Sequence, residues 1–469
     1  MSVLLKNPMV ADGVSPTAYV SDILISGSVI VDVRPDIDAD AEALDLSGLY
    51  VTPGFIDAHS HDDFFPTLGE HKIRQGITAE ITGNCGLGCF PVKAGMTQYF
   101  RAAGLPCTDS SGEDYAAYSS FCGKTATRHA ALVPHSNIRY ISDGHMSRML
   151  ELLERCLEQG AIGMSAGLCS PPGSLANAAE LEPLCAAVAQ HGGIFAVHLR
   201  DEFEIDRSLD ECIGLAEKTG VRLQISHIKA FCPVNFGRAR VIINQIEAAR
   251  SRGIEITADC YPYTASMTGF AALAPDFAEG IARRGGTDRI FMDGQFRQKK
   301  QAGDFFVSCK AEKSSHRFAS LSELAKAENV TPEALAERFA HTGVAAIFEC
   351  MDSADVDEFI TTPWVMIGTD GVLSPPIHPR TYGAFAKYLD AYVNKKKLLT
   401  FAEAVRKITS LPADVFRLPD CGRLAKGYRA DLVVLDLPRV TSSADYANPE
   451  VYPQGIKGVM IDGKWVYRE

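Results

Sequence analysis

The stretch PGFIDAHSHDD at residues 53–63 decides the fold, because it ends an apolar, strand-like run with two histidines. His59 and His61 stand two positions apart, and side chains so spaced on an extended chain point the same way. Both imidazoles can therefore reach one metal ion, and Asp62 and Asp63 follow directly with their carboxylates. The stretch predicts a strand whose carboxyl end carries metal ligands.

Seven more apolar runs along the chain end in a similar way. They end near Asn84, His135, Leu168, His198, His227, Tyr261 and Asp370. Helical patterns lie between several of them, at 147–159, 178–191 and 241–252, and each is followed by glycine. Alternating strands and helices predict a parallel sheet. Eight strand ends in roughly 310 residues predict an α/β fold, a TIM-like (β/α)8 barrel.

The chain of 469 residues is longer than the roughly 250 that such a barrel needs. Both ends contain short strand-like runs with glycine turns, and neither end can bury a good core alone. We therefore expect a small β-sandwich domain from residues 1–57 and 413–469, and the barrel from residues 58–412. Residues 280–345, between strands seven and eight, predict an insertion over the barrel mouth that could serve as a lid. The alternative is an ordinary lengthened helical layer.

Composition limits the class of protein. Hydrophobic residues make up 46% and charged residues 22%, which are globular values that exclude a disordered or fibrous chain. A net charge of −12 argues against nucleic acid or an anionic membrane as a partner. The 13 cysteines are odd in number and scattered, and no signal or membrane segment is evident, so we expect a cytoplasmic protein. The sequence leaves the oligomeric state open.

Metal-binding residue types fall at the predicted strand ends, where a barrel of this kind has its site. His198 and His227 end successive strands, and Asp370 ends the last one. Cys85 lies between glycines in GITAEITGNCG, and we predict a thiolate ligand there; a buried structural cysteine is the alternative, and Cys89 is the weaker candidate. Histidines with a thiol and a carboxylate form a set suited to zinc.

Longer motifs point to a family. They are PGFIDAHSHDD at 53–63, GITAEITGNCG at 76–86, GAIGMSAGL at 160–168, VHLRDE at 197–202, QISHIKA at 224–230, DCYPYTAS at 259–266, GTDG at 368–371 and HPRTYGAF at 378–385. With these motifs the whole chain resembles the amidohydrolase superfamily, and specifically the N-acyl-D-amino-acid deacylases, or D-aminoacylases. The combination of GNCG, SHIK, DCYPY and HPRTYG is the most specific part of this resemblance.

The resemblance implies a catalytic barrel with one or two zinc ions and a small N-acyl amino acid as substrate. By matching position, Cys85, His198 and His227 would hold the tight ion, and His59 and His61 would bind a second or weaker one. Asp370 would contact the metal or its water and act as general base and acid. The products would be a carboxylate and a free D-amino acid.

A free amino-acid half carries an α-carboxylate, which calls for cations and hydrogen-bond donors. Arg380, Lys229 and Tyr261 are the contacts that the resemblance implies, with His378 beside them; a surface ion pair is the alternative for Arg380. Two further residues are expected to support the site or to be structural, namely His135 and Asp259. Ser170, in GLCSPPG, stands where family members often have a tyrosine, so binding of the substrate must differ there.

Three alternatives remain open at this stage. A related site could open a cyclic amide, as in dihydroorotases and hydantoinases, although these usually carry a bridging lysine rather than GNCG. A dipeptidase would also cleave an amide beside a carboxylate. A catalytically silent scaffold should have lost some of the ligands, and this chain keeps all six.

Overall fold

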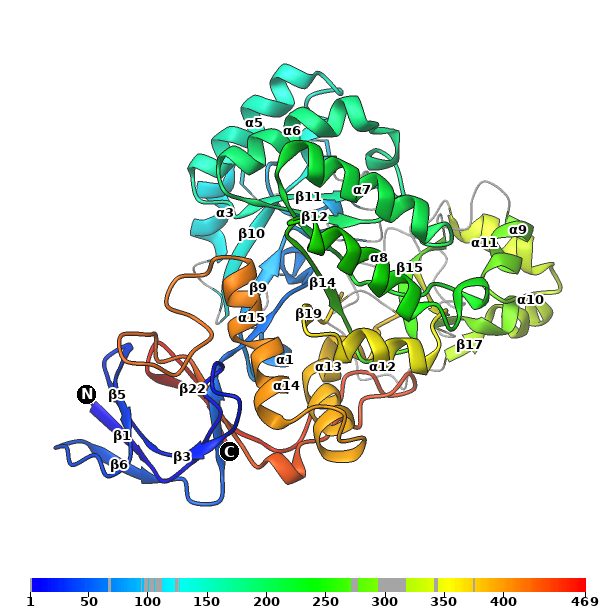
Figure 1. The fold of residues 1–469 in the computed structure, drawn as a ribbon. Helices are drawn as coiled ribbons and strands as arrows, with labels where there is room; N and C mark the ends of the chain where they lie inside the picture. Colours follow the sequence, from blue (N-terminus) through cyan, green and yellow to red (C-terminus); the bar gives the residue numbers. More distant parts are fainter. Residues whose placement is uncertain are drawn as a thin grey trace.

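The computed structural model contains a barrel of eight parallel strands that neighbour one another in chain order (Figure 1). The strands are β8 (Phe55–Asp57), β9 (Ile77–Thr82), β10 (Arg128–Pro134), β11 (Gly163–Gly167), β12 (Ile194–His198), β13 (Arg222–Ile225), β14 (Ile256–Cys260) and β19 (Val365–Ile367). Each strand ends within a few residues of its predicted end, and the predicted barrel is confirmed. β8 and β19 close the barrel, with backbone hydrogen bonds from Ala58 N to Ile367 O (3.3 Å) and from Asp370 N to His59 O (2.8 Å).

The structure describes most of the chain. The described residues are 2–65, 69–93, 95–96, 100, 105, 112–122, 125, 127–270, 277–293, 318–340, 345–373 and 376–469. Among them, no helix has both the length and the apolar character needed to cross a membrane.

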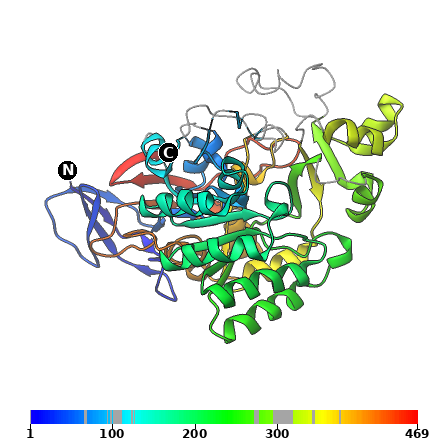
Figure 2. The same ribbon diagram turned by 90° about the horizontal axis from the view of Figure 1, so that it is seen from above.

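Helices surround the barrel (Figures 1 and 2). They include α1 (Glu70–Ile73), α3 (Tyr115–Cys122), α4 (His135–Ile141), α5 (Met146–Glu158), α6 (Ala178–Gln190), α7 (Ile205–Thr219), α8 (Ala239–Ser251), α12 (Ser353–Thr361), α13 (Arg380–Leu389), α14 (Phe401–Ile408) and α15 (Ser410–Val415). The three predicted helices match α5, α6 and α8 within one or two residues. In α5 the buried side chains Met149, Leu153 and Cys156 recur at helical spacing and face the sheet layer.

Apolar side chains fill the inside of the barrel. A buried cluster contains Ala58, Ile81, Leu132, Ile194, Ala196 and Met366 from the strands, with Leu411 and Phe416 at and just after α15. The interior is therefore a packed core rather than a channel, as expected for a barrel of this type. The possible metal ligands lie at the carboxyl ends of the strands.

Both chain termini build the β-sandwich, as predicted. One sheet has the order β5 (Val29–Arg34), β4 (Asp22–Ser26), β1 (Ser2–Lys6) and β6 (Glu42–Asp45). The other has the order β22 (Lys464–Arg468), β21 (Ile456–Ile461), β20 (Leu432–Leu435), β7 (Tyr50–Pro53), β2 (Met9–Val10) and β3 (Tyr19–Val20). Leu5, Ile23 and Val51 from the first end pack in one core with Leu432 and Met460 from the other. Each end thus supplies the apolar face that the other needs.

An insertion separates β14 from β19. It contains an antiparallel sheet of β15 (Ala265–Gly269), β18 (Ala345–Glu349), β16 (Ile290–Asp293) and β17 (Phe318–Ser320), with α9 (Phe277–Arg283), α10 (Leu321–Glu328) and α11 (Pro332–Ala340). Figures 1 and 2 show it on the side of the barrel away from the β-sandwich. Residues 294–317 and 341–344 of the predicted lid lie outside the described residues, and the lid stays a prediction.

The packed interior makes a stability prediction. Leu132→Ala removes a fully buried side chain from the barrel core, and we expect a loss of about 2–5 kcal/mol in the free energy of unfolding. The measurement is urea unfolding followed by circular dichroism. Leu175→Ala is the control, because that side chain is 63% exposed and its loss should change stability by about 0.5 kcal/mol or less. Equal effects of both variants would contradict a packed barrel core.

Candidate active site

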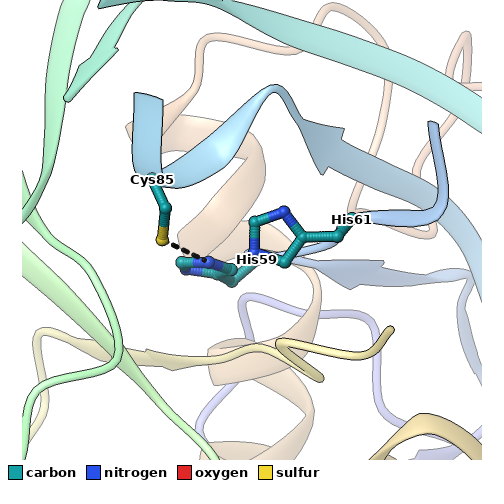
Figure 3. Close-up of side chains that lie close together, drawn as sticks. All are labelled: His59, His61 and Cys85. Atoms are coloured by element: carbon teal, nitrogen blue, oxygen red, sulfur yellow. Dashed lines mark hydrogen bonds between the residues drawn. The ribbon is translucent and has the colours of Figure 1, made fainter. Parts of the chain in front are cut away.

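Six polar side chains from five strand ends gather at the carboxyl edge of the barrel. Two groups of possible metal ligands overlap there, and within each group the ligand atoms lie within 4.8 Å of one another. The groups are His59, His61 and Cys85, and Cys85, His198 and His227. Cys85 belongs to both, with Sγ 3.4 Å from His59 Nε2 and 3.4 Å from His227 Nε2. Figure 3 shows Cys85 pointing from its loop toward the His59 ring, with His61 alongside.

The GNCG loop after β9 has a backbone that explains its glycines. Gly83 has φ +71°, and a Cβ on it would lie 2.2 Å from Leu132 O. Gly86 has φ +73°, and its Cβ would lie 2.7 Å from Gly167 N. The Asn84 amide donates to Ile81 O at 2.8 Å and anchors the turn. The loop therefore packs directly on the neighbouring strands, which brings Cys85 in toward the histidines.

Three of the six residues are strained in the backbone. Cys85, His227 and Asp370 have φ values of 53°, 37° and 46°, in the left-handed region that non-glycine residues seldom adopt. Hydrogen bonds hold two of them in place: His227 N donates to Asp259 Oδ2 at 3.0 Å, and Asp370 N donates to His59 O at 2.8 Å. Strain of this kind persists where the surroundings fix it, and it is common at functional sites.

Asp370 lies between the histidines and a cation. Its Oδ1 is 3.5 Å from His59 Nε2 and 3.4 Å from His61 Nε2, while its Oδ2 is 2.8 Å from Arg380 Nη1. Burial alone would raise the pKa of this carboxyl, but Arg380 and His59 hold the pKa well below its usual range. Asp370 is therefore a carboxylate in the folded protein.

The charges of the site favour a bound cation. Burial would raise the pKa of the Cys85 thiol, but the nearby His59 and His227 hold it well below its usual value, so the sulfur is a thiolate. For His61, burial would lower the pKa, but hydrogen bonds with Asp370 and Cys85 raise it to about 9. The thiolate and the carboxylate thus hold a proton on His61, and a metal ion can replace that proton.

The donor set fits zinc. Thiolate sulfur and imidazole nitrogen are its preferred ligands, and each group supplies three of them. His61 Nδ1 is also buried without a hydrogen-bond partner among the described residues. The two groups share Cys85, so these residues would supply ligands for one ion or for two.

Two carboxylates contact ring nitrogens of the histidines in the ligand groups. Asp259 Oδ2 is 3.3 Å from His59 Nδ1, so Asp259 orients a neighbour, one of the two roles that the sequence left open. Glu202 Oε1 is 3.5 Å from His227 Nδ1 and 3.8 Å from His198 Nε2. Sequence reasoning missed Glu202, although it follows His198 by four residues within the VHLRDE motif.

The residues predicted to contact substrate lie beside Asp370. Arg380 is 1% exposed, and its guanidinium stacks over the Tyr261 ring at 4.5 Å from the ring centroid, so the surface ion pair considered above is wrong. Arg380 Nε and the Tyr261 hydroxyl are buried and have no hydrogen-bond partner among the described residues. Lys229 is buried and pairs with Glu202, with Nζ 2.9 Å from His227 Nδ1.

Other candidates lie further from the cluster. His378 Nε2 donates to Ala265 O at 3.0 Å, and its Nδ1 accepts from Arg380 N at 3.1 Å, so both ring nitrogens are used within the protein. His135 Nε2 is 2.9 Å from Glu180 Oε1. Cys89 Sγ donates to Asp63 O at 3.0 Å and is in neither ligand group.

Comparisons with known proteins give a consistent result. A family model described as "Amidohydrolase family" matches residues 165–467. The chain is 33% identical to the N-acyl-D-glutamate deacylase of Alcaligenes xylosoxydans xylosoxydans, over 100% of this chain and 94% of that protein. It is 32% identical to the D-aminoacylase of the same organism, with the same coverage of 100% and 94%.

A solved structure agrees with these matches over the whole fold. It is the N-acyl-D-glutamate deacylase from Bordetella bronchiseptica complexed with zinc and a phosphonate inhibitor that mimics the tetrahedral intermediate of the reaction. The TM-score is 0.86 and the sequence identity 30%, over 99% of this chain and 96% of that one. Barrel and β-sandwich are therefore both shared with this relative.

The shared thiolate makes a prediction about metal binding. Cys85→Ala removes the donor that both ligand groups contain, and we expect zinc content to fall by at least about tenfold. Elemental analysis of the purified, dialysed protein measures it. Cys89→Ala is the matched control, because this nearby buried thiol is in neither group, and it should keep its zinc. Unchanged zinc in Cys85→Ala would make this cysteine structural.

Proposed function

The chain belongs to the amidohydrolase family, and from this premise we propose that it is a zinc-dependent hydrolase of N-acyl-D-amino acids. Water and the amide give a carboxylate and a free D-amino acid. The observation that carries the proposal is the position of Asp370, in contact with two possible metal ligands on one side and with Arg380 on the other. This arrangement puts a base, a set of metal ligands and a carboxylate-binding cation within reach of one amide.

The ligands have defined parts in the proposed site. Cys85, His198 and His227 would hold the tight ion, and His59 and His61 would hold a second or weaker one; Cys85 lies within reach of both groups. When bound, zinc supplies a Lewis acid that polarises a carbonyl oxygen and makes water more acidic. Asp259 and Glu202 hold the rings of His59 and His227 in orientation from behind.

Asp370 moves the proton. As a carboxylate, it accepts a proton from the water molecule whose oxygen attacks the amide carbon. It then gives this proton to the amide nitrogen as the carbon–nitrogen bond breaks, and the amine leaves neutral. One group serves as base and then as acid because the same oxygen can face first the water and then the leaving amine.

Arg380, Tyr261 and Lys229 bind the α-carboxylate of the substrate in this proposal. Arg380 has a buried Nε–H without a partner among the described residues, and a substrate oxygen can accept from it. Burial raises the pKa of the Tyr261 phenol well above its usual value, so it stays protonated and can donate. Glu202 pairs with Lys229 and leaves it as the weaker of the two cations. His378 keeps the start of α13 in place through Arg380 N.

The side chain of the preferred amino acid follows from none of these contacts. Ser170 is exposed in the turn after β11, where the family often has a tyrosine, so a phenol contact is replaced by a short hydroxyl. Relatives named for D-glutamate and for D-amino acids in general match this chain almost equally well, at 33% and 32% identity. We therefore propose the class of substrate and leave its side chain to experiment.

A substrate panel tests the proposed function directly. We expect zinc-loaded protein to release amine from N-acetyl-D-amino acids, with acidic, apolar and polar side chains compared side by side, because the relatives matched over nearly their full length are named for D-substrates. Amine release is measured with a colorimetric reagent. The matched L-series, dipeptides and cyclic amides are the controls. Activity confined to L-substrates, dipeptides or cyclic amides would overturn the proposal.

A substitution tests the proposed base. Asp370→Asn keeps the size of the side chain but removes the proton acceptor, and we expect kcat to fall by about 10²–10⁴-fold with the fold retained. Asp355→Asn is the control for losing a buried carboxylate, because Asp355 only accepts from Gly237 N and Ala239 N at the start of α8. It should keep kcat per folded molecule. Near-normal turnover in Asp370→Asn would exclude it as the base.

A further inference from the structure

A buried lysine lies behind the active site and outside both ligand groups. Lys72 on α1 is 0% exposed, and its Nζ uses three hydrogen bonds, to Asp57 Oδ2 (2.6 Å), Ser60 Oγ (3.0 Å) and Thr369 Oγ1 (3.0 Å). Glu80 Oε2 lies a further 3.2 Å away. The ammonium therefore has no donor left over, and it contacts none of the six proposed ligand and base side chains.

The partners of Lys72 are sequence neighbours of the active-site residues. Ser60 stands between His59 and His61, and Thr369 directly precedes Asp370. Lys72 thus joins the segment that carries two ligands to the segment that carries the proposed base.

Asp57 completes the link between the two segments. Its Oδ1 accepts from His59 N at 3.2 Å and from Thr369 N at 2.8 Å. Its Oδ2 accepts from Lys72 Nζ and from Thr369 Oγ1, both at 2.6 Å. The two contacts with Thr369 cross from β8 to the segment after β19, the place where the barrel closes.

The charge of Lys72 is maintained by its surroundings. Burial alone would lower the pKa of the ammonium, but Asp57, Asp62 and Glu80 raise it above its usual value. A buried ion pair of this kind contributes little net stability compared with an apolar replacement, although removing one partner is costly. The buried charge of Lys72 is therefore better explained by the positions it fixes for its neighbours than by a contribution to stability.

We propose that Lys72 is a positioning residue, which holds His59, His61 and Asp370 in their relative places across the closing strands through Asp57, Ser60 and Thr369. Only the expected effect on turnover rests on the proposed function; the positioning itself does not. Misplacing a reacting group by about 1 Å can lower the rate by about 10²-fold. Small movements between β8 and the segment after β19 are therefore sufficient to slow the reaction.

The kinetic test uses Thr369→Val, which removes the hydroxyl that accepts from Lys72 and donates to Asp57, and which keeps the shape of the side chain. We expect kcat to fall by about 10–100-fold with KM changed by less than about threefold. The proposed substrate-binding residues make no hydrogen bond to Thr369 among the described contacts, so substrate binding should change little. Thr369→Ser restores a hydroxyl and should recover most of the turnover. Lys72→Met should behave like Thr369→Val where it folds.

A metal titration tests the same inference without any substrate. Metal-free protein is titrated with zinc against a chelator of known affinity. In Thr369→Val the weaker ion, assigned to His59 and His61, should bind about tenfold less tightly. The tight ion of Cys85, His198 and His227 should be unchanged, because those ligands come from other strands. If no N-acyl amino acid is hydrolysed, the proposed function fails and this titration still decides the role of Lys72.

Lys407→Met is the matched control for the lysine. Lys407 is also buried, at 2% exposure, but among the described residues its Nζ donates to the backbone oxygen of Thr362 alone. This variant should keep both zinc affinities and kcat per folded molecule. The inference is overturned if Thr369→Val and Lys72→Met lose stability alone, with both zinc affinities and kcat unchanged. It is also overturned if Lys407→Met loses as much turnover as they do.

Discussion

The closure of the barrel between β8 and β19 is the contact on which the active site depends. Asp370 N donates to His59 O across this junction, and Asp57 binds the backbone on both sides of it. The first strand supplies two histidines and the last supplies the carboxylate that lies against them. Residues some 310 positions apart in the chain therefore form one site only when the barrel closes in register. The backbone strain at Asp370 is tolerated for the same reason, since bonds from both sides hold it.

Much of this architecture could be predicted from local sequence, and the reason is the parallel barrel. Every strand runs the same way, so the residue that ends each apolar run must lie at the common carboxyl edge. His59, Cys85, His198, His227 and Asp370 could be assembled from that rule, before any contact was known. The pairing of the two chain ends followed from their shortness, because neither could bury its own apolar face.

Supporting residues could not be predicted in this way, because their role lies in contacts with distant parts of the chain. Lys72 belongs to a short, charged stretch, EHKIRQG, that is typical of an exposed helix, yet it is fully buried among carboxylates. Glu202 carried a weak signal, four residues after His198, but its link to Lys229 crosses to another strand. Asp259 could be an orienting or a structural residue until its distance from His59 was known.

Arg380 connects substrate binding with the proton transfer in the proposed mechanism. Its guanidinium lies 2.8 Å from Asp370 and helps to hold the pKa of that carboxyl well below its usual range, which by itself makes Asp370 a weak base. A substrate carboxylate on the same guanidinium would bring a second negative charge, and Arg380 would then stabilise the Asp370 carboxylate less. In the proposed mechanism, substrate binding would therefore raise the pKa of Asp370, and the carboxylate would take a proton more readily. In this proposal, one buried cation of an acidic protein would both select a carboxylate-bearing substrate and make the base effective once that substrate has bound.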